Sequence, residues 1–288
     1  MKKFICIVAF LLGFAVGLPL VVNGQSKFGD LLIEPERQIS QFRRLLVTPT
    51  PIPTEPPEGQ VLGTVDINES AREITIAVLG DSMIDVLQPD LPQLQSSLKK
   101  YYPEVRFNLF NFGVGASDLE YAVERLNEEY VYLGSKYPAV LSVKPDVLVI
   151  ESFSYNNFGY GQEGLDKQWM LIGDIITRTN KISPDTQIVL AATIAPNATV
   201  YGNGIDGIEW NQAERLVRSE TVKEYLQNII NFANSQGYPL ADAYHASIDE
   251  YGEGKPVYIN AQDNLHPSGP GGELFCQKVA EAIAELDL

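Results

Sequence analysis

The segment ITIAVLGDSMID, residues 74–85, places a run of mostly apolar residues directly before a Gly-Asp-Ser sequence. The apolar run predicts a buried strand that ends at the glycine. In open α/β sheets, ligands bind outside the carboxyl ends of the strands. The hydroxyl of Ser82 is therefore a candidate nucleophile, with capping of a following helix as the alternative role. We expect the first helix only at residue 91, which leaves Ser82 in a loop.

From this segment onward, apolar runs alternate with segments of helical period. The alternation predicts a parallel sheet that is covered by helices. Runs such as DVLVIESF (146–153) and TQIVLAATIA (186–195) are apolar at successive positions, as expected for strands that are buried on both faces. The expected strands are 74–79, 105–110, 147–153, 187–193 and 238–242, and the expected helices are 91–101, 118–129, 164–179, 212–235 and 272–286.

The composition is that of a globular protein and argues against nucleic acid as a partner. The 288 residues are 45% hydrophobic and carry a formal net charge of −16. Binding to a phosphate backbone needs clustered Lys and Arg to displace counterions. The acidic balance is better explained by solubility.

The N-terminal residues predict export. Residues 1–24 contain Lys2 and Lys3 and then an uncharged apolar run at 4–22, the layout of a signal peptide or an N-terminal membrane anchor. Both possibilities remain open, and both place the following domain outside the cytoplasm, either secreted or anchored on the outer face of the cytoplasmic membrane. Contact with a membrane is expected only through this segment, if it is uncleaved.

Residues 25–60 are expected to form a juxtamembrane segment and a linker. The prolines of TPTPIPTEPPEG (48–59) favour an extended polyproline conformation. The folded catalytic domain is therefore expected at 61–288. Cys276 is its single cysteine, so we expect no disulfide and no thiolate metal site there.

A serine nucleophile needs a base, usually a histidine that a carboxylate orients. The chain has two histidines, and each follows an aspartate by three residues: His245 follows Asp242, and His266 follows Asp263. The spacing alone does not distinguish them. The Pro/Gly-rich loop around His266 favours this residue, because catalytic groups collect in loops at the carboxyl edge of the sheet. For His245, a solvent-facing or capping role is the preferred interpretation.

Four segments resemble, in order, the signature blocks of the SGNH (GDSL-type) hydrolases: GDSM at 80–83, NFGVG at 111–115, SYNN at 154–157 and DNLHPSG at 263–269. The resemblance extends from about residue 72 to the C-terminus. It implies an α/β fold, a flavodoxin-like three-layer α/β/α sandwich with a mostly parallel five-stranded sheet. It also implies that Ser82 is the nucleophile, His266 the base and Asp263 the residue that orients the base.

The same resemblance implies an oxyanion hole made by the backbone N–H of Ser82, a glycine N–H in the second block and the side chain of Asn156. The second block of the family commonly reads Asn-x-Gly-x-x-Gly, which places the last glycine on Ala116. A shift of one residue places it on Gly115, which we take as the expected donor. The third block usually reads Gly-x-Asn-Asp and here reads Ser-Tyr-Asn-Asn, so the Asn156 donor is kept. A turn residue after a strand is the alternative role of Asn156.

Aromatic residues near the expected site are candidates for substrate binding. Tyr155 adjoins the third block, and Tyr201 and Trp210 lie in PNATVYGNGIDGIEW (196–210). Aromatic surface of this kind suits either a sugar ring or an acyl chain. Ordinary packing within the loops is the alternative.

The expected function is an exported serine esterase that hydrolyses carboxylic esters through an acyl-serine intermediate. We expect an acetyl group as the acyl part and a cell-envelope or extracellular glycan as its carrier, with no cofactor and no metal. A non-catalytic carbohydrate-binding module on the same fold and an O-acyltransferase are the alternatives. A pair of carboxylates for glycoside cleavage is less favoured, because Asp81 and Glu151 are better explained as solvated or hydrogen-bonded loop acids.

Overall fold

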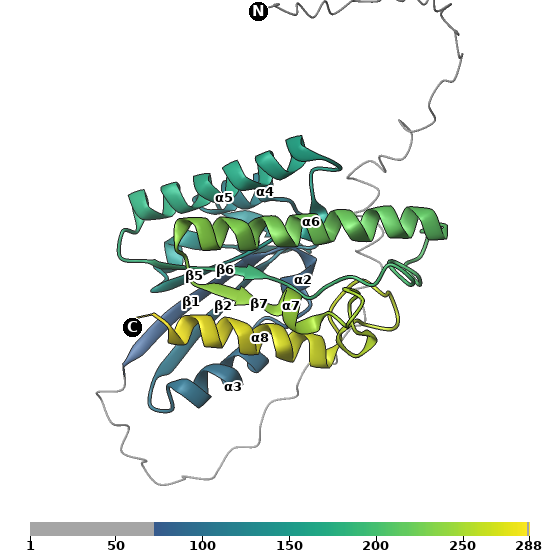
Figure 1. The fold of residues 1–288 in the computed structure, drawn as a ribbon. Helices are drawn as coiled ribbons and strands as arrows, with labels where there is room; N and C mark the ends of the chain where they lie inside the picture. Colours follow the sequence, from purple (N-terminus) through teal and green to yellow (C-terminus); the bar gives the residue numbers. More distant parts are fainter. Residues whose placement is uncertain (1–71, 287) are drawn as a thin grey trace, which may run out of the picture. The chain divides into compact units, whose positions relative to one another are not determined.

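The strand that precedes the Gly-Asp-Ser sequence lies inside a five-stranded sheet with helices on both sides (Figure 1). The computed structural model describes residues 72–286 and 288. The expected signal or anchor segment and the Pro-rich linker lie outside these residues. In the part of the chain that is described, no helix is both long and apolar enough to cross a membrane.

The sheet is parallel throughout, and its strand order is β2-β1-β5-β6-β7. The chain moves from β1 to one edge, returns across β1, and then continues to the other edge. The strand order therefore reverses between β1 and β5, and such a switch point is where ligands bind in flavodoxin-like sheets. The strands are β1 (Glu73–Gly80), β2 (Arg106–Gly113), β5 (Val147–Glu151), β6 (Gln187–Ala192) and β7 (Leu240–Asp242).

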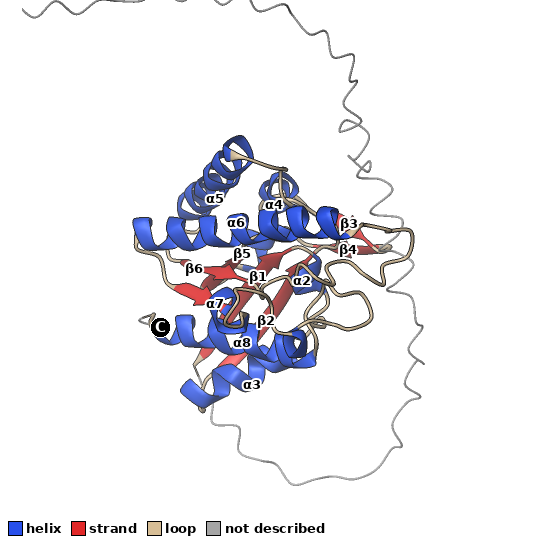
Figure 2. Cartoon of the chain, turned by 45° about the vertical axis from the view of Figure 1, so that its right-hand side comes forward, coloured by secondary structure: helices blue, strands red, loops and turns tan. Residues whose placement is uncertain are grey.

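Two layers of helices cover the sheet, and two short helices lie at its carboxyl edge (Figure 2). One layer contains α4 (Leu119–Arg125), α5 (Gln162–Ile182) and α6 (Gln212–Gln236), and the other contains α3 (Pro92–Tyr101) and α8 (Gly269–Ala284). The short helices are α2 (Ser82–Asp85) and α7 (Ala243–Ser247). The 3-10 turns are η2 (Val140–Val143), η3 (Ser154–Asn156) and η4 (Pro256–Tyr258). Two further strands, β3 (Tyr130–Tyr132) and β4 (Ser135–Tyr137), form an antiparallel hairpin.

The central strands supply both halves of the core. In β1, Ile76 and Val78 face α3 and α8, whereas Ala77 and Leu79 face the layer of α4, α5 and α6. All of these side chains are at most 1% exposed. A strand with apolar residues at successive positions is stable only between two covering layers, because either face would otherwise expose apolar surface.

The ten predicted strands and helices are all present, with ends that differ by a few residues, and the flavodoxin-like prediction is confirmed. The prediction that Ser82 lies in a loop is wrong, because α2 begins at Ser82. One helical turn is too short to produce a periodic pattern in the sequence. The sequence analysis also missed α7 and the β3–β4 hairpin, which are similarly short.

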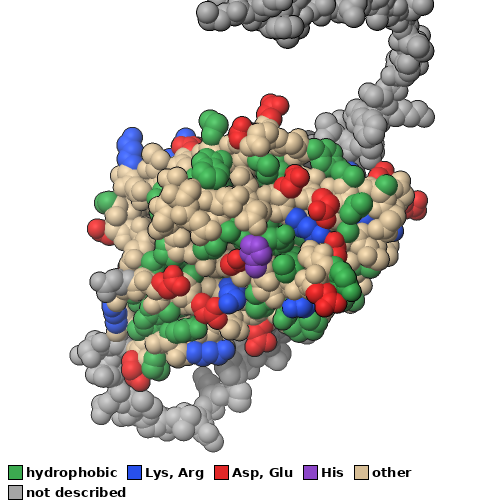
Figure 3. Space-filling model, viewed as in Figure 1, with side chains coloured by type: hydrophobic (Ala, Val, Ile, Leu, Met, Phe, Trp, Pro, Cys, Tyr) green, Lys and Arg blue, Asp and Glu red, His purple; other side chains and the backbone are tan. Residues whose placement is uncertain are grey.

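Charged side chains of both signs are spread over the surface that Figure 3 shows. On the face drawn in Figure 3, acidic side chains are scattered among basic and apolar ones and do not merge into one acidic patch. The ion pair of Arg178 with Asp174 along α5, at 2.9 Å, is exposed. Exposed pairs of this type contribute at most about 1 kcal/mol each, so the fold depends on its core.

Gly113, the last residue of β2, permits a close approach of α2. A Cβ atom at this position would lie 2.2 Å from the backbone nitrogen of Asp85. We predict that Gly113→Ala lowers the free energy of unfolding by at least about 1–3 kcal/mol, because a backbone atom must move to make room. Urea denaturation of the purified domain measures this loss.

Gly173 in α5 is the matched control. No atom lies within 4 Å of a Cβ built at this position. Gly173→Ala should stabilise the domain by up to about 1 kcal/mol, because glycine is unfavourable inside a helix. Equal effects of the two substitutions would contradict the close approach of β2 and α2.

Candidate active site

Ser82 lies at the start of α2, directly beyond the carboxyl end of β1. Its side chain is nearly buried, since the residue is 5% exposed. The preceding residue, Asp81, caps the helix through a 2.8 Å hydrogen bond that Oδ1 accepts from the backbone N–H of Met83. Asp81 therefore takes the capping role that the sequence analysis had considered for Ser82, and the serine hydroxyl is not needed for it.

Asn156 lies beyond the carboxyl end of β5, the strand beside β1. Its Nδ2 atom donates a 2.8 Å hydrogen bond to Oδ2 of Asp81. The structure thus brings Asn156 and the segment of Ser82 together across the switch point of the sheet. The amide group carries two hydrogen atoms, so one N–H remains for a second acceptor.

Asp263 and His266 form a buried pair in the loop before α8. His266 Nδ1 lies 3.0 Å from Oδ2 of Asp263, while Oδ1 accepts hydrogen bonds from the backbone N–H groups of Leu265 and His266. The His266 side chain is 8% exposed. Burial raises the pKa of Asp263, but the hydrogen bond and charge of His266 together with the two backbone donors outweigh it, and the pKa lies below its usual value. Asp263 is therefore held as an ionised acceptor that fixes the ring.

The loop of His266 packs against α2. Ile259, at the start of this loop, shares a small apolar cluster with Met83, the residue after Ser82. Burial raises the pKa values of Asp81 and Asp85, and the charge of His266 opposes the rise in both cases. The imidazole therefore acts electrostatically on Asp81 and Asp85, the nearest acidic residues on either side of Ser82 in the sequence.

The second Asp-x-x-His pair has the same local geometry in a different place. His245 Nδ1 lies 2.6 Å from Oδ2 of Asp242, whose Oδ1 accepts from the backbone N–H of His245 and caps α7. The His245 side chain is 47% exposed. It follows β7, which is three strands from β1, or roughly 14 Å at the usual strand spacing. The two pairs differ in burial and position, and only the pair at residues 263–266 adjoins the segment of Ser82.

The second signature block, residues 111–115, is linked by hydrogen bonds to the β3–β4 hairpin and through it to α2. The backbone N–H of Gly115 donates a 3.0 Å hydrogen bond to the hydroxyl of Tyr132, which in turn donates to Oδ2 of Asp85 at 2.7 Å. This bond occupies the donor that the sequence analysis assigned to the oxyanion hole. The next residue, Ala116, has a φ of +55°, in the left-handed region that glycine adopts more readily. A glycine at this position, which the sequence resemblance implies, would adopt the same angle with less strain.

A buried arginine, which the sequence analysis missed, joins the ends of β1 and β2. Arg125 is 1% exposed, and its guanidinium donates to the carbonyl oxygens of Phe112 at 2.7 Å and Gly80 at 3.2 Å. Burial lowers its pKa, which the aromatic neighbours Tyr121 and Tyr130 partly oppose. A sequence signal existed, because Arg125 lies three residues after the buried Ala122 of α4.

Glu151 is a second buried charged residue near the site. It ends β5 and is fully buried, as is Asp81, so of the two roles expected for these acids the hydrogen-bonded one is confirmed and the solvated one is wrong. Burial, together with the charge of Asp81, raises the pKa of Glu151 well above its usual value. Neither carboxyl group is open to a bound sugar, which argues against glycoside cleavage by this pair.

The three predicted substrate-binding aromatic residues lie together but are not equally accessible. Tyr201 is 4% exposed and stacks on Trp210 with ring centroids 5.7 Å apart, which is the packing given as its alternative role, and its part in substrate binding stays a prediction. Burial also raises the pKa of its hydroxyl group. Tyr155 and Trp210 are partly exposed. The Tyr155 hydroxyl donates to the carbonyl oxygen of Ile194 at 3.1 Å.

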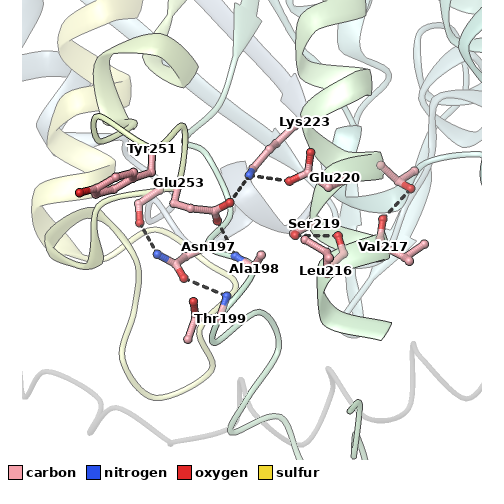
Figure 4. A network of polar contacts seen from close by, with 12 residues as sticks. Asn197, Ala198, Thr199, Leu216, Val217, Ser219, Glu220, Lys223, Tyr251 and Glu253 are labelled. Carbon is pink, nitrogen blue, oxygen red and sulfur yellow. Dashed lines mark hydrogen bonds and ion pairs between the residues drawn. The ribbon is translucent and has the colours of Figure 1, made fainter. Parts of the chain in front are cut away.

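A polar network anchors the segment that follows β6 (Figure 4). Lys223 of α6 lies 2.8 Å from Glu220 and 2.6 Å from Glu253, and Glu253 also accepts from the backbone N–H of Ala198 at 2.7 Å. Asn197 donates to the carbonyl oxygen of Gly254 at 2.9 Å. The segment at 196–210 is therefore joined to α6 and to the loop after α7.

No metal centre is evident in the described part. Among residues 72–286 and 288, no group of three His, Cys, Asp or Glu side chains is placed to hold a metal ion. The buried thiol of Cys276 lies in α8, and burial raises its pKa to about 12. It is therefore held as a neutral thiol.

Solved structures of esterases and related proteins share this fold. The acetylxylan esterase of Geobacillus stearothermophilus aligns with a TM-score of 0.52 and 16% sequence identity, over 74% of this chain and 95% of that one. A protein described as a GDSL-like lipase, from Parabacteroides merdae, aligns with a TM-score of 0.53 and 17% identity, over 74% of this chain and 96% of that one. No family model matches the chain, and no curated protein matches its sequence. The fold implied by the sequence resemblance is thus confirmed.

The hydroxyl of Tyr132 is a testable link between the hairpin and the site. We predict that Tyr132→Phe lowers the free energy of unfolding by about 1–3 kcal/mol, because Gly115 N–H and Asp85 each lose a partner in a poorly solvated place. Thermal and urea denaturation measure the loss. Tyr251→Phe is the control, because Tyr251 is 81% exposed and should be unaffected.

Proposed function

We propose that the protein is a serine esterase that hydrolyses carboxylic esters, with Ser82 as the nucleophile, His266 as the base and Asp263 as the residue that orients the base. The observation that carries this proposal is the buried Asp263–His266 pair packed against the segment of Ser82, with Nδ1 of the ring bound to the carboxylate at 3.0 Å. That bond leaves Nε2 as the atom for proton transfer. The shared fold with an acetylxylan esterase and a GDSL-like lipase supports the reaction class.

The reaction proceeds in two halves. His266 takes the proton of Ser82 Oγ as this oxygen attacks the ester carbonyl carbon, and the carbonyl electron pair moves onto oxygen. The tetrahedral intermediate then expels the alcohol, which receives the proton from His266, and the acyl group remains on Ser82. Water deacylates the serine by the same proton transfers and releases the carboxylic acid. Asp263 remains ionised and stabilises the charged imidazole.

The developing oxyanion requires donors near Ser82. We assign the backbone N–H of Ser82, the second N–H of the Asn156 amide and the backbone N–H of Ala116. Ala116 replaces Gly115 in this proposal because the Gly115 N–H donates to Tyr132. Each donor of this type contributes on the order of 10²- to 10³-fold to turnover.

The expected substrate is a small acyl ester on a glycan. Ser82 is 5% exposed and the His266 side chain 8%, which favours a short acyl group such as acetyl at the reacting atoms. Acetylated xylan is the substrate class in the name of one structural neighbour. Export by the N-terminal segment, as either a secreted or an anchored enzyme, would bring the domain to extracytoplasmic glycans.

The first prediction from this proposal compares the two histidines. His266→Ala should lower kcat by at least about 10⁴-fold, because Ser82 loses its base. His245→Ala should leave kcat within about threefold of the unchanged protein, since a half-exposed side chain is replaced. Hydrolysis of p-nitrophenyl acetate by the purified domain measures both rates.

The controls for this comparison separate catalysis from folding. Circular dichroism must show that both histidine variants are folded. Ser82→Ala should abolish both turnover and labelling by a fluorophosphonate, and Asp263→Asn should slow turnover by on the order of 10³-fold or more. If His245→Ala were inactive and His266→Ala active, the assignment of the base would be wrong.

A second prediction concerns the acyl group. Turnover should fall steeply from acetyl to octanoyl esters of the same phenol, because the nearly buried reacting groups leave little room for a long chain. Release of acetate from acetylated xylan and from acetylated peptidoglycan would identify the glycan. Preference for long chains would instead indicate a lipase.

One observation favours a second candidate, a non-catalytic carbohydrate-binding module. Gly115 N–H and one N–H of Asn156 are already bonded within the protein. A module of this type would bind a glycan without reacting with the fluorophosphonate. Stoichiometric labelling that is lost in Ser82→Ala excludes it, whereas transfer of the acyl group to an added sugar in place of water would indicate an acyltransferase.

A further inference from the structure

We propose that Glu151 is a positioning residue whose buried carboxyl group holds the turn between β5 and η3, so that Asn156 is presented to Ser82. This inference rests on the proposed function, because it assigns Asn156 to the oxyanion hole. Glu151 itself lies beneath the turn and touches no reacting atom in this scheme.

The carboxyl group of Glu151 is bonded to both residues that follow it. The hydroxyl of Ser152 donates to Oε1 at 2.6 Å, and the backbone N–H of Phe153 donates to Oε2 at 2.9 Å. Glu151, Ser152 and Phe153 are each at most 1% exposed, so water does not compete for these bonds. The side chain thus folds back over its own strand end and fixes the direction in which the chain leaves β5.

Phe153 is the residue on which this turn depends. Its φ of +52° lies in the left-handed region, which residues other than glycine and asparagine rarely adopt. The surrounding contacts must therefore impose this conformation, and the bond from Phe153 N–H to Glu151 is one of them. The carbonyl oxygen of Phe153 then accepts from the backbone N–H of Asn156 at 3.1 Å, which closes the η3 turn.

The turn is linked to Asp81 by a hydrogen bond from Asn156. Asn156 Nδ2 donates to Oδ2 of Asp81 at 2.8 Å, one residue before Ser82. A Cβ atom built on Gly80, the last residue of β1, would lie 3.2 Å from the Cβ atom of Glu151. Glu151 thus lies beside the last residue of β1 and, through Phe153, fixes the chain that leaves β5.

The rest of the turn is braced from the helices and cannot substitute for Glu151. The carbonyl oxygen of Ser152 accepts from Gln168 of α5 at 2.8 Å, and Gln168 accepts from Asn228 of α6 at 2.8 Å. These bonds involve the carbonyl oxygen of Ser152, whereas the backbone N–H of Phe153 bonds to the carboxyl group of Glu151. Loss of the carboxyl group would leave that buried donor without a partner.

Two substitutions separate hydrogen bonding from volume. Glu151→Leu removes the polar atoms and keeps most of the volume, so Asn156 should lose its fixed place. We expect kcat for p-nitrophenyl acetate to fall about 10- to 100-fold, with KM changed less than about twofold, because a donor to the oxyanion is misplaced. Glu151→Gln keeps an acceptor for Phe153 and a donor toward Ser152, and it should restore kcat to within about threefold of the unchanged protein.

Inhibition by a small alkylboronic acid tests the oxyanion hole directly, because the adduct with a serine is tetrahedral. The inhibition constant should rise in Glu151→Leu in proportion to the fall in kcat. Thr186→Val is the matched control for a buried polar loss: Thr186 is 7% exposed, donates to Pro145 at 2.7 Å, and lies at the amino end of β6, opposite the site. This control should keep kcat even if its melting temperature falls.

Three outcomes would overturn the inference. They are an unchanged kcat in folded Glu151→Leu, a rise in KM without a fall in kcat, and an equal fall of kcat in Thr186→Val. Ser82→Ala distinguishes failure of the inference from failure of the proposed function. If only the inference is wrong, Ser82→Ala is still inactive. If the proposed function is wrong, Ser82→Ala is as active as the unchanged protein. In that case, the side-chain amide NMR signals of Asn156, assigned by their loss in Asn156→Ala, decide the inference. They should move in Glu151→Leu and not in Thr186→Val, and unmoved signals would overturn it.

Discussion

The buried carboxylate of Asp81 is the interaction on which the arrangement of the site depends. It lies where β1 ends, and its two oxygens accept from the backbone of Met83 and from the amide of Asn156. One residue thus starts the helix that carries Ser82 and attaches the end of β5 to the end of β1. A carboxylate removed from water is stable only when it is bonded in this way, so the neighbouring chain must supply the donors.

The residues around Asp81 are arranged to tolerate that charge. Arg125 brings a positive group to the carbonyl oxygens at the ends of β1 and β2, and its charge opposes the rise in the pKa of Asp81 that burial causes. Glu151 has its pKa raised further, by burial and by Asp81 itself, which favours its neutral form. The two buried carboxyl groups therefore need not carry two uncompensated charges. Buried polar groups of this kind are often no more stabilising than well-packed apolar residues, so we explain them by the geometry that their hydrogen bonds impose on the strand ends.

The sequence predicted the parts of the fold that repeat over many residues. Strands such as β5 and long helices such as α5 leave periodic or continuous apolar patterns, and these were located to within a few residues. Short elements outside the alternation of sheet strands and long helices, including α2 and the hairpin that carries Tyr132, leave no such pattern. The oxyanion donor could not be chosen from the sequence either, because the choice between Gly115 and Ala116 depends on one backbone angle and on a hydroxyl group 17 residues away.

The two Asp-x-x-His pairs show why local sequence is insufficient to identify a catalytic base. In both, the aspartate accepts from the backbone and from Nδ1 of its histidine, so each motif folds into the same small structure. Their difference arises from topology: β7 is an edge strand far from β1, whereas the loop at 259–268 crosses back and packs on Met83. An aspartate that orients a histidine is therefore a common local device. It becomes a candidate for catalysis only where the crossover order of the sheet places it beside a candidate nucleophile, as the loop of His266 lies against the segment of Ser82.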